Sequence, residues 1–268
     1  MGNKITLFKD LEYYEENKKY FNRHYNDVTK KYIGVKRIGR CSFLYKKYKT
    51  NDYQEFANKY FDDYVGNDFN TETLYGDENY GRSINQLTII ANKLKEELKD
   101  DVNVTLEMCL DLLITHTIIE TIDGHIVENE VIDYLKRYDK FIVNNEIDEI
   151  DSNFNVDITV RNKLNNALIS YIQVKPISTF LSNSEGVRKD RVNFFKKQMD
   201  FNRYLTEQNK TEDIKEIDYM VYDIEPVGKK HKFLINPKTN KKTFKLNELT
   251  DENGNVILKR NELSFEFL

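Results

Sequence analysis

Three β-rich segments follow one another between residues 140 and 175, and this succession constrains the fold more than any other feature of the chain. They read KFIVNNEIDEI, NVDITV and ALISYIQVK, and β-branched and aromatic residues dominate them. Apolar residues recur at helical spacing before them, over 123–138, and after them, over 188–208. A further alternating segment at 214–227 predicts another strand, and a hairpin is expected to turn at 237–240. The order predicts an α+β protein with an α/β core, in which helices flank a mixed central β-sheet.

The region before these strands is predicted to be mostly helical. Leu87, Ile90, Ala91, Leu94 and Leu98 recur along one face of a helix over 84–98. The segment 104–122 is apolar nearly all round, which predicts a buried helix, and a turn containing glycine separates it from the next helix. The turn-rich stretch YGDENYGRS suggests a boundary, so we expect an N-terminal subdomain over 1–80 and a second domain over 81–268.

Composition excludes several classes of protein. The chain has 268 residues, which is enough to bury a sizeable core, and its two cysteines make no disulfide framework, so we expect a cytoplasmic protein. No apolar run approaches the roughly 18 residues of a membrane span. P-loop, serine-hydrolase and zinc-protease motifs are absent from the sequence.

The N-terminal region carries a basic, aromatic segment. Between residues 18 and 49 there are eleven Lys or Arg residues, opposed only by Asp27, with Tyr and Phe interleaved. Basic side chains neutralise phosphates and aromatic faces stack on bases, so the segment is a candidate DNA-contacting subdomain. A solvated basic face on a helical subdomain explains the same pattern. The residues that we single out for DNA contact here are Lys36, Arg37 and Arg40.

One constellation in the β-rich region suggests chemistry. Asp157 lies in the second β-rich segment, and Gln173 and Lys175 lie in the third. If the two segments are neighbouring strands, Gln173 and Lys175 share a face and Asp157 can join them. Carboxylate and amide oxygens suit Mg²⁺, which makes its bound water a nucleophile, and an ammonium stabilises a developing phosphorane. The alternative is an ordinary strand-edge charge beside a solvated strand face.

This pattern resembles the PD-(D/E)XK nuclease superfamily, whose motif is Asp in one strand, then Glu or Asp, one residue and Lys in the next. Val156 stands where that motif often has Pro, and Gln173 replaces the acidic residue, as in some type II restriction enzymes. The resemblance covers about 80 residues, from Gly124 to about Leu205. It implies a restriction-endonuclease-like fold, with Asp157 and Gln173 as Mg²⁺ ligands and Lys175 as a catalytic residue.

The resemblance also implies an acidic residue on the helix before the first core strand. Glu128 in GHIVENEVIDYL is the candidate for that position, as a further metal ligand and catalytic residue, with Glu120 and Glu130 as weaker ones. The helix after the strands would face the DNA backbone with Arg188 and Arg191, accompanied by Lys189, Lys196 and Lys197. The segment 80–137 is also similar to MjaI-type restriction endonucleases, which would imply a CTAG-like target.

The sequence therefore predicts a Mg²⁺-dependent, sequence-specific endonuclease of double-stranded DNA, a type II restriction enzyme. Palindromic sites pair naturally with two-fold symmetry, so we expect a homodimer, with a cognate DNA methyltransferase as its genetic partner in restriction-modification. Two alternatives stay open. One is a repair or junction nuclease with the same core, and the other is a non-catalytic DNA-binding protein whose site has decayed at Gln173.

Overall fold

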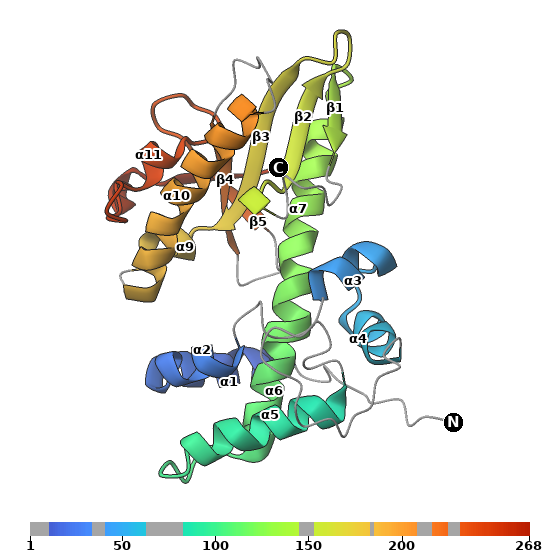
Figure 1. The fold of residues 1–268 in the computed structure, drawn as a ribbon, viewed down its shortest axis with the longest axis vertical. Helices are drawn as coiled ribbons and strands as arrows, with labels where there is room; N and C mark the ends of the chain where they lie inside the picture. Colours follow the sequence, from blue (N-terminus) through green and yellow to red (C-terminus); the bar gives the residue numbers. More distant parts are fainter. Residues whose placement is uncertain are drawn as a thin grey trace. The chain divides into compact units, whose positions relative to one another are not determined.

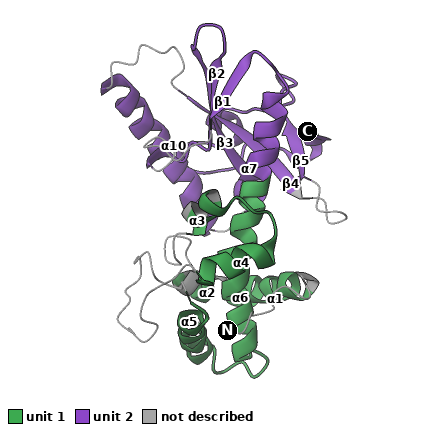
Figure 2. Cartoon of the chain, turned by 90° about the vertical axis from the view of Figure 1, so that its right-hand side faces the viewer, with its two compact units in different colours: residues 1–126 green, residues 127–268 purple. Residues whose placement is uncertain are grey.

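The computed structural model (Figure 1) describes residues 11–33, 41–62, 83–144, 153–182, 185–207, 216–224 and 231–268. The chain forms two compact units, Met1–Ile126 and Val127–Leu268, which Figure 2 colours separately. Each unit has a hydrophobic core made of its own residues. The division falls within one helix, α7, which runs over Glu120–Lys136.

The described part of unit 1 is helical, as the sequence predicts. Its aromatic residues supply much of the core: Phe21, Phe56 and Tyr60 have no exposed surface and pack with the apolar face of α5. Ser83 caps the first turn of α5 by accepting a hydrogen bond from the Gln86 N–H. The helices before α7 are α1 (Leu11–His24), α2 (Asn26–Ile33), α3 (Cys41–Tyr48), α4 (Tyr53–Asp62), α5 (Ile84–Glu97) and α6 (Leu106–Ile114), followed by the π-helical turn η1 (Thr115–Ile119).

The apolar segment after α5 differs from the expected pair of helices. α6, η1 and α7 follow one another directly, and Gly124 lies inside α7 instead of in a turn. A glycine inside a helix costs only about 1 kcal/mol relative to alanine, so the packing of Ile122 and Val127 on either side can keep the helix intact. The prediction of an inter-helix turn at Gly124 is therefore wrong, whereas the buried character of the segment is confirmed.

The boundary between the units also differs from the expected one at residue 80. The described helices from α5 to the start of α7 belong to unit 1. Leu87, Leu94 and Leu112 join the same core as Phe21 and Phe56, so their burial depends on the N-terminal helices. Of the turn-rich stretch over 75–83, all residues but Ser83 lie outside the described residues.

Unit 2 is built on a six-stranded mixed sheet, as expected for an α+β protein. The strands lie in chain order, and every neighbouring pair is antiparallel except β3 and β4, which are parallel. A parallel pair needs a crossover connection, which α9 and α10 supply. The elements are β1 (Phe141–Asn144), β2 (Ile158–Asn162), β3 (Leu168–Pro176), α9 (Ser178–Leu181), α10 (Glu185–Glu207), β4 (Ile217–Ile224), β5 (His231–Ile235), α11 (Leu246–Leu249), the 3-10 turn η2 (Arg260–Glu262) and β6 (Ser264–Phe267).

The two faces of this sheet carry different helices, α10 on one side and α7 on the other (Figure 2). On the α10 face, Phe201 packs with Tyr171 and Tyr219. On the α7 face, Val127 and Val131 pack with Ile172, Val174 and Met220. Successive residues of β3 therefore alternate between the two cores, as side chains of a strand must.

Two details of unit 2 differ from the expected pattern. Val192 and Met199 belong to the apolar series that predicts the helix over 188–208, yet they are 40% and 66% exposed. Phe201 and Leu205 lie in the core, with Phe194 and Phe195 packed against it. The expected turn after β5 forms, with Asn240 in the left-handed conformation. The residues after that turn do not pair with β5. Phe244 forms a bridge with Tyr219 of β4 instead, and the neighbour of β5 on its other edge is β6.

Candidate functional site

Asp157 lies immediately before β2 and is bonded twice to β3. Its backbone N–H donates to the Ile172 carbonyl at 2.9 Å, and its carboxylate Oδ2 accepts from the Val174 N–H at 2.7 Å. These two bonds place the Asp157 carboxylate against the stretch of β3 that contains Gln173. The sequence prediction that Asp157 and Gln173 lie on neighbouring strands is therefore confirmed for the backbone.

Gln173 is a polar residue in a buried position. Its side chain is 1% exposed, and the amide Nε2 has no hydrogen-bond partner among the described residues. Leaving a buried polar group unpaired costs about 1–3 kcal/mol, so such a group usually marks a missing ligand, water or ion. A half-turn of the amide exchanges its nitrogen and oxygen, so the same position can present a carbonyl oxygen instead.

Gln173 and Lys175 share the α10 face of the sheet. Tyr171 belongs to the core on this face, and Gln173 and Lys175 follow it at intervals of two residues along β3. Lys175 is half-buried and pairs in register with Val221 of β4, which also belongs to the α10 face. In the part of the chain that the structure describes, the Lys175 ammonium has neither an ion pair nor a hydrogen bond. Both residues lie near the carboxyl end of β3, where open α/β sheets commonly bind ligands.

Tyr219 is a neighbour of this group that the sequence did not single out. It pairs in register with Gln173 and is buried on the α10 face. Burial and, after it, the negative charge of Asp157 raise the pKa of the Tyr219 phenol. The charge of Asp157 therefore acts on the same face as Gln173. Only the strand register identifies Tyr219, because nothing in the local sequence distinguishes it from a core tyrosine.

Glu128 lies on α7, so it belongs to a different side of the sheet from Gln173. Its neighbours Val127 and Val131 pack on the face formed by Ile172 and Val174. The structure therefore does not bring Glu128 onto the face that carries Gln173 and Lys175. Among the weaker candidates, Glu120 pairs with His116 and Lys18 in unit 1, and Glu130 pairs with His231 at 3.0 Å.

The residues chosen for DNA contact separate into three cases. Arg188 is exposed at the start of α10, and its Nε donates to the Asn253 carbonyl at 3.0 Å. Arg191 is only 2% exposed, so the prediction that it contacts DNA is wrong. Its guanidinium donates to the carbonyls of Gly254 (2.7 Å), Ser182 (2.8 Å) and Thr179 (3.2 Å). Lys36, Arg37 and Arg40 lie outside the described residues.

Some residues of the basic N-terminal segment interact within the helical unit itself. Lys18 pairs with Glu120, and Lys31 pairs with Glu97 at 2.8 Å. Tyr20 and Tyr25 donate to Asp101 Oδ2 at 2.6 and 2.5 Å, and Tyr45 stacks on His125 at 4.4 Å between ring centroids. Among the aromatic residues that are described, those in the core act as packing residues and not as exposed stacking platforms. The histidine His125 belongs to this packing as well.

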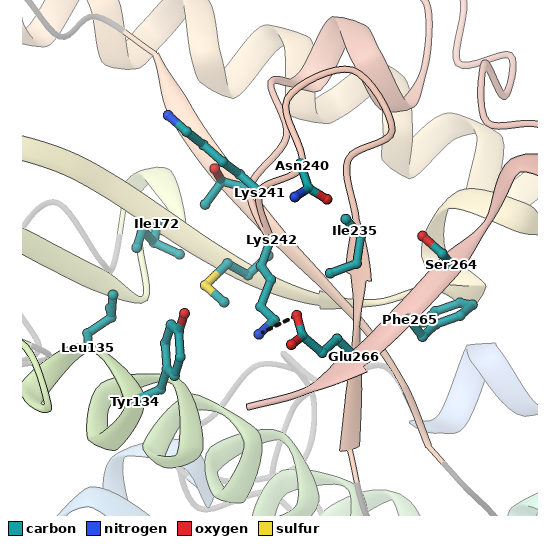
Figure 3. Close-up of a pocket in the computed structure, with 12 residues that line it drawn as sticks. Tyr134, Leu135, Ile172, Ile235, Asn240, Lys241, Lys242, Ser264, Phe265 and Glu266 are labelled. Atoms are coloured by element: carbon teal, nitrogen blue, oxygen red, sulfur yellow. Dashed lines mark ion pairs between the residues drawn. The ribbon is translucent and has the colours of Figure 1, made fainter.

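A cavity of about 610 Å³ lies on the α7 side of the sheet, separate from the face of Gln173. Figure 3 shows the residues that line it. Ile172 and Met220 contribute to its wall, and Lys242 pairs with Glu266 at 3.1 Å and lies over the Tyr134 ring at 5.0 Å. Lys242, a partly buried cation of this cavity, therefore already has an acidic partner. Within the described ranges, no three His, Cys, Asp or Glu side chains gather as a metal site. A metal on the Gln173 face would depend on Asp157, an amide oxygen and water.

Comparison with known proteins adds no relative: no family model, no curated protein and no solved structure matches the chain. No helix in the described ranges is long and apolar enough to cross a membrane.

Proposed function

We propose that the chain is a Mg²⁺-dependent endonuclease of double-stranded DNA, with Asp157, Gln173 and Lys175 as its active site. The observation that carries the proposal is the buried Gln173 amide beside the Asp157 carboxylate, because its nitrogen Nε2 has no hydrogen-bond partner among the described residues. Lys175 shares the sheet face of Gln173. An ordinary sheet core has no reason to combine these three groups, because each loses hydration there. A phosphodiester-hydrolysing site can use each of them, the carboxylate and the amide oxygen as Mg²⁺ ligands and the ammonium as a charge for the phosphate.

The residues fit Mg²⁺ by their chemistry. Asp157 and the Gln173 amide offer hard oxygen donors, and a Mg²⁺ site completes its shell with water and a substrate phosphate. Bound Mg²⁺ supplies the Lewis-acid charge that phosphodiester hydrolysis needs. The Val174 N–H orients Asp157 by holding Oδ2, so the carboxylate is positioned before substrate arrives.

Lys175 provides positive charge toward the scissile phosphate. Its ammonium can hydrogen-bond a non-bridging oxygen and stabilise the charge that develops on the phosphorane. The half-buried position strengthens this interaction, because the effective dielectric is lower there than in water. The helix–strand–strand–strand–helix order of α7, β1, β2, β3 and α10 supports the restriction-endonuclease-like core that the motif implies.

We further propose that this nuclease is a type II restriction enzyme. Type II enzymes cut both strands of a short palindrome, so we propose a homodimer on double-stranded DNA with a methyltransferase as genetic partner. Glu128, on the α7 side of the sheet, is proposed as an assisting carboxylate for the substrate and not as a ligand beside Gln173. Arg188, with Lys36, Arg37 and Arg40, is proposed to contact the DNA backbone.

The test is digestion of unmethylated phage DNA by the purified protein, with Mg²⁺ in one series and EDTA in the other. We expect discrete fragments that require Mg²⁺. A Mg²⁺-dependent smear of fragments would show that the protein is a nuclease of low sequence specificity and not a restriction enzyme. DNA that is bound yet intact in both series would favour a non-catalytic DNA-binding protein. The neutral Gln173, in place of an acidic metal ligand, is the residue that favours this alternative.

A further inference from the structure

We infer that Lys197 of α10 is a positioning residue for the Asp157 carboxylate and acts through Asn155. The Lys197 Nζ donates to Asn155 Oδ1 at 2.6 Å, and Asn155 precedes Asp157 by two residues. This inference rests on the proposed nuclease site. It adds to that site a residue from a helix that contributes none of the three proposed active-site groups.

Asn155 has a backbone conformation that needs support. Its φ angle is 57°, in the left-handed region that residues with a Cβ atom disfavour and that Asn tolerates better than most. A hydrogen bond to the side chain of such a residue helps to hold the backbone there. Lys197 supplies that bond from α10.

The position of Asn155 gives this local conformation a consequence for the site. On one side of it, Phe154 packs against Phe201 of α10, with ring centroids 5.2 Å apart. On the other side, Asp157 is bonded to Ile172 and Val174 of β3. Asn155 thus connects Phe154, which packs on α10, with the segment that positions the Asp157 carboxylate.

Lys197 and Phe201 are four residues apart, so they lie on one side of α10. From that side they contact two consecutive residues, Asn155 and Phe154. The aromatic contact fixes Phe154, and the Lys197 bond fixes the turn at Asn155. Together they determine how the chain enters β2. Loss of the Lys197 bond should therefore loosen the Asp157 carboxylate without removing any metal ligand.

The experiment measures Mn²⁺ affinity, as a spectroscopic substitute for Mg²⁺, by electron paramagnetic resonance on the full chain. The variants are Lys197→Met, which keeps the aliphatic stem, Lys197→Arg, which keeps a donor, and Asn155→Gly, which keeps access to positive φ but removes the acceptor. Arg203→Met is the matched control, because Arg203 is an exposed cation of the same helix. Thermal unfolding of each variant shows whether it is folded.

We expect Lys197→Met to raise the Mn²⁺ dissociation constant by about tenfold or more, as loss of a partner behind a metal ligand typically does. Lys197→Arg should restore most of the affinity, and Arg203→Met should leave it unchanged. The double variant Lys197→Met, Asn155→Gly should bind no more weakly than the weaker single variant, because both remove one hydrogen bond. Cleavage of DNA at saturating Mn²⁺ should fall less than cleavage at limiting Mn²⁺.

The outcomes separate this inference from the function on which it rests. A wild-type protein that binds no Mn²⁺ would overturn the proposed metal site and the role of Lys197 together. Wild-type binding with equal binding by folded Lys197→Met would overturn the role of Lys197 and leave the metal site standing. If Lys197→Met does not fold, unaltered affinity in Asn155→Gly would contradict the inference by itself.

Discussion

At the scale of single residues, Gln173 is the position at which the proposed metal site differs most from an ordinary sheet core. Its amide is buried and its Nε2 has no hydrogen-bond partner among the described residues, so replacing it by Leu should cost little stability and should remove the proposed ligand. Replacing it by Glu places a carboxylate where water is excluded, and burial opposes its charge. The two substitutions thus have similar volumes and opposite consequences for metal binding.

We expect Gln173→Glu to lower the melting temperature in EDTA and to recover it in Mg²⁺, because a ligand that binds only the native state stabilises that state. Gln173→Leu should show no Mg²⁺-dependent change in melting temperature. Thermal unfolding of both variants and the wild type, with and without Mg²⁺, provides the measurement. A Gln173→Glu protein that Mg²⁺ does not stabilise would show that this position is not a ligand position.

Much of the candidate site could be predicted from the sequence at this scale, and the exceptions have a common cause. Asp157, Gln173 and Lys175 were predictable because strand alternation and a short connection determine which residues can meet. Arg191 was assigned to DNA because the family resemblance implies that this basic helix faces the DNA backbone. Its burial depends on carbonyls of Thr179, Ser182 and Gly254, and the positions of such distant groups leave no local pattern in the sequence.

At the scale of elements, Arg191 joins α10 to the loop before Asn255 and to α9. Gly254 in that loop has a φ of 75°, and a Cβ there would lie 2.6 Å from the Arg188 carbonyl. The loop therefore approaches α10 as closely as a glycine allows. The arginine and the glycine together fix the N-terminal half of α10 against the C-terminal segment.

We expect Arg191→Met to lower the free energy of unfolding by about 2–4 kcal/mol, because three carbonyls lose a charged donor in a buried place. Arg203→Met, at an exposed position of the same helix, is the control and should change it by less than about 0.5 kcal/mol. Urea unfolding gives both values. Equal stability of the two variants would contradict the structural role of Arg191.

The elements themselves were predictable where apolar periodicity was strong. The helix over 84–98 and the strands β2, β3 and β4 fall close to their expected positions. The exposed Val192 and Met199 show the limit of this reasoning, since two apolar series run along α10 and only tertiary packing selects Phe201 and Leu205. The prediction of a hairpin around 237–240 was wrong for its second strand, which does not pair with β5. Strand partners depend on the whole sheet, and here β6 takes that place.

At the scale of the whole molecule, carboxyl groups of unit 1 should make stability depend on pH in two opposite ways. Burial alone would raise the pKa of Glu120, but the hydrogen bond and charge of His116 and the charge of Lys18 lower it to about 2. Its folded pKa lies below the unfolded value, so its contribution to stability is present above about pH 4.5. That contribution is lost as the pH falls toward 2.

We expect the free energy of unfolding of Glu120→Gln to fall less than that of wild type between about pH 4.5 and 2, because the variant has no carboxyl at this position to take up a proton. Denaturant unfolding across this range measures it. Glu252→Gln, at an exposed position in unit 2, is the control and should leave the acid limb unchanged. An identical acid limb in Glu120→Gln and the wild type would show that the His116 and Lys18 partners do not stabilise the charged carboxyl.

Asp111 acts in the opposite sense. Burial, and then the charge of Glu107, raise the pKa of Asp111 to about 6, above its unfolded value of about 3.9. Its folded form binds the proton more tightly, so stability from this group is gained as the pH falls from about 6 to 4. Asp111→Asn should therefore be more stable than wild type at pH 7, and this advantage should shrink at pH 4. Denaturant unfolding at the two pH values tests this, and an advantage that does not shrink would contradict it.

We propose that Asp157, Gln173 and Lys175 form the site at which the whole protein hydrolyses DNA. The most direct test compares the Mg²⁺-dependent DNA cleavage rates of wild type, Lys175→Ala and Lys163→Ala. Lys163 is an exposed lysine in the turn between β2 and β3, away from the site end of both strands. We predict that Lys175→Ala cleaves at least about 100-fold more slowly while it binds DNA with similar affinity, and that Lys163→Ala cleaves normally. Equal rates for Lys175→Ala and wild type would contradict the account, and so would a wild-type protein that leaves DNA intact in Mg²⁺.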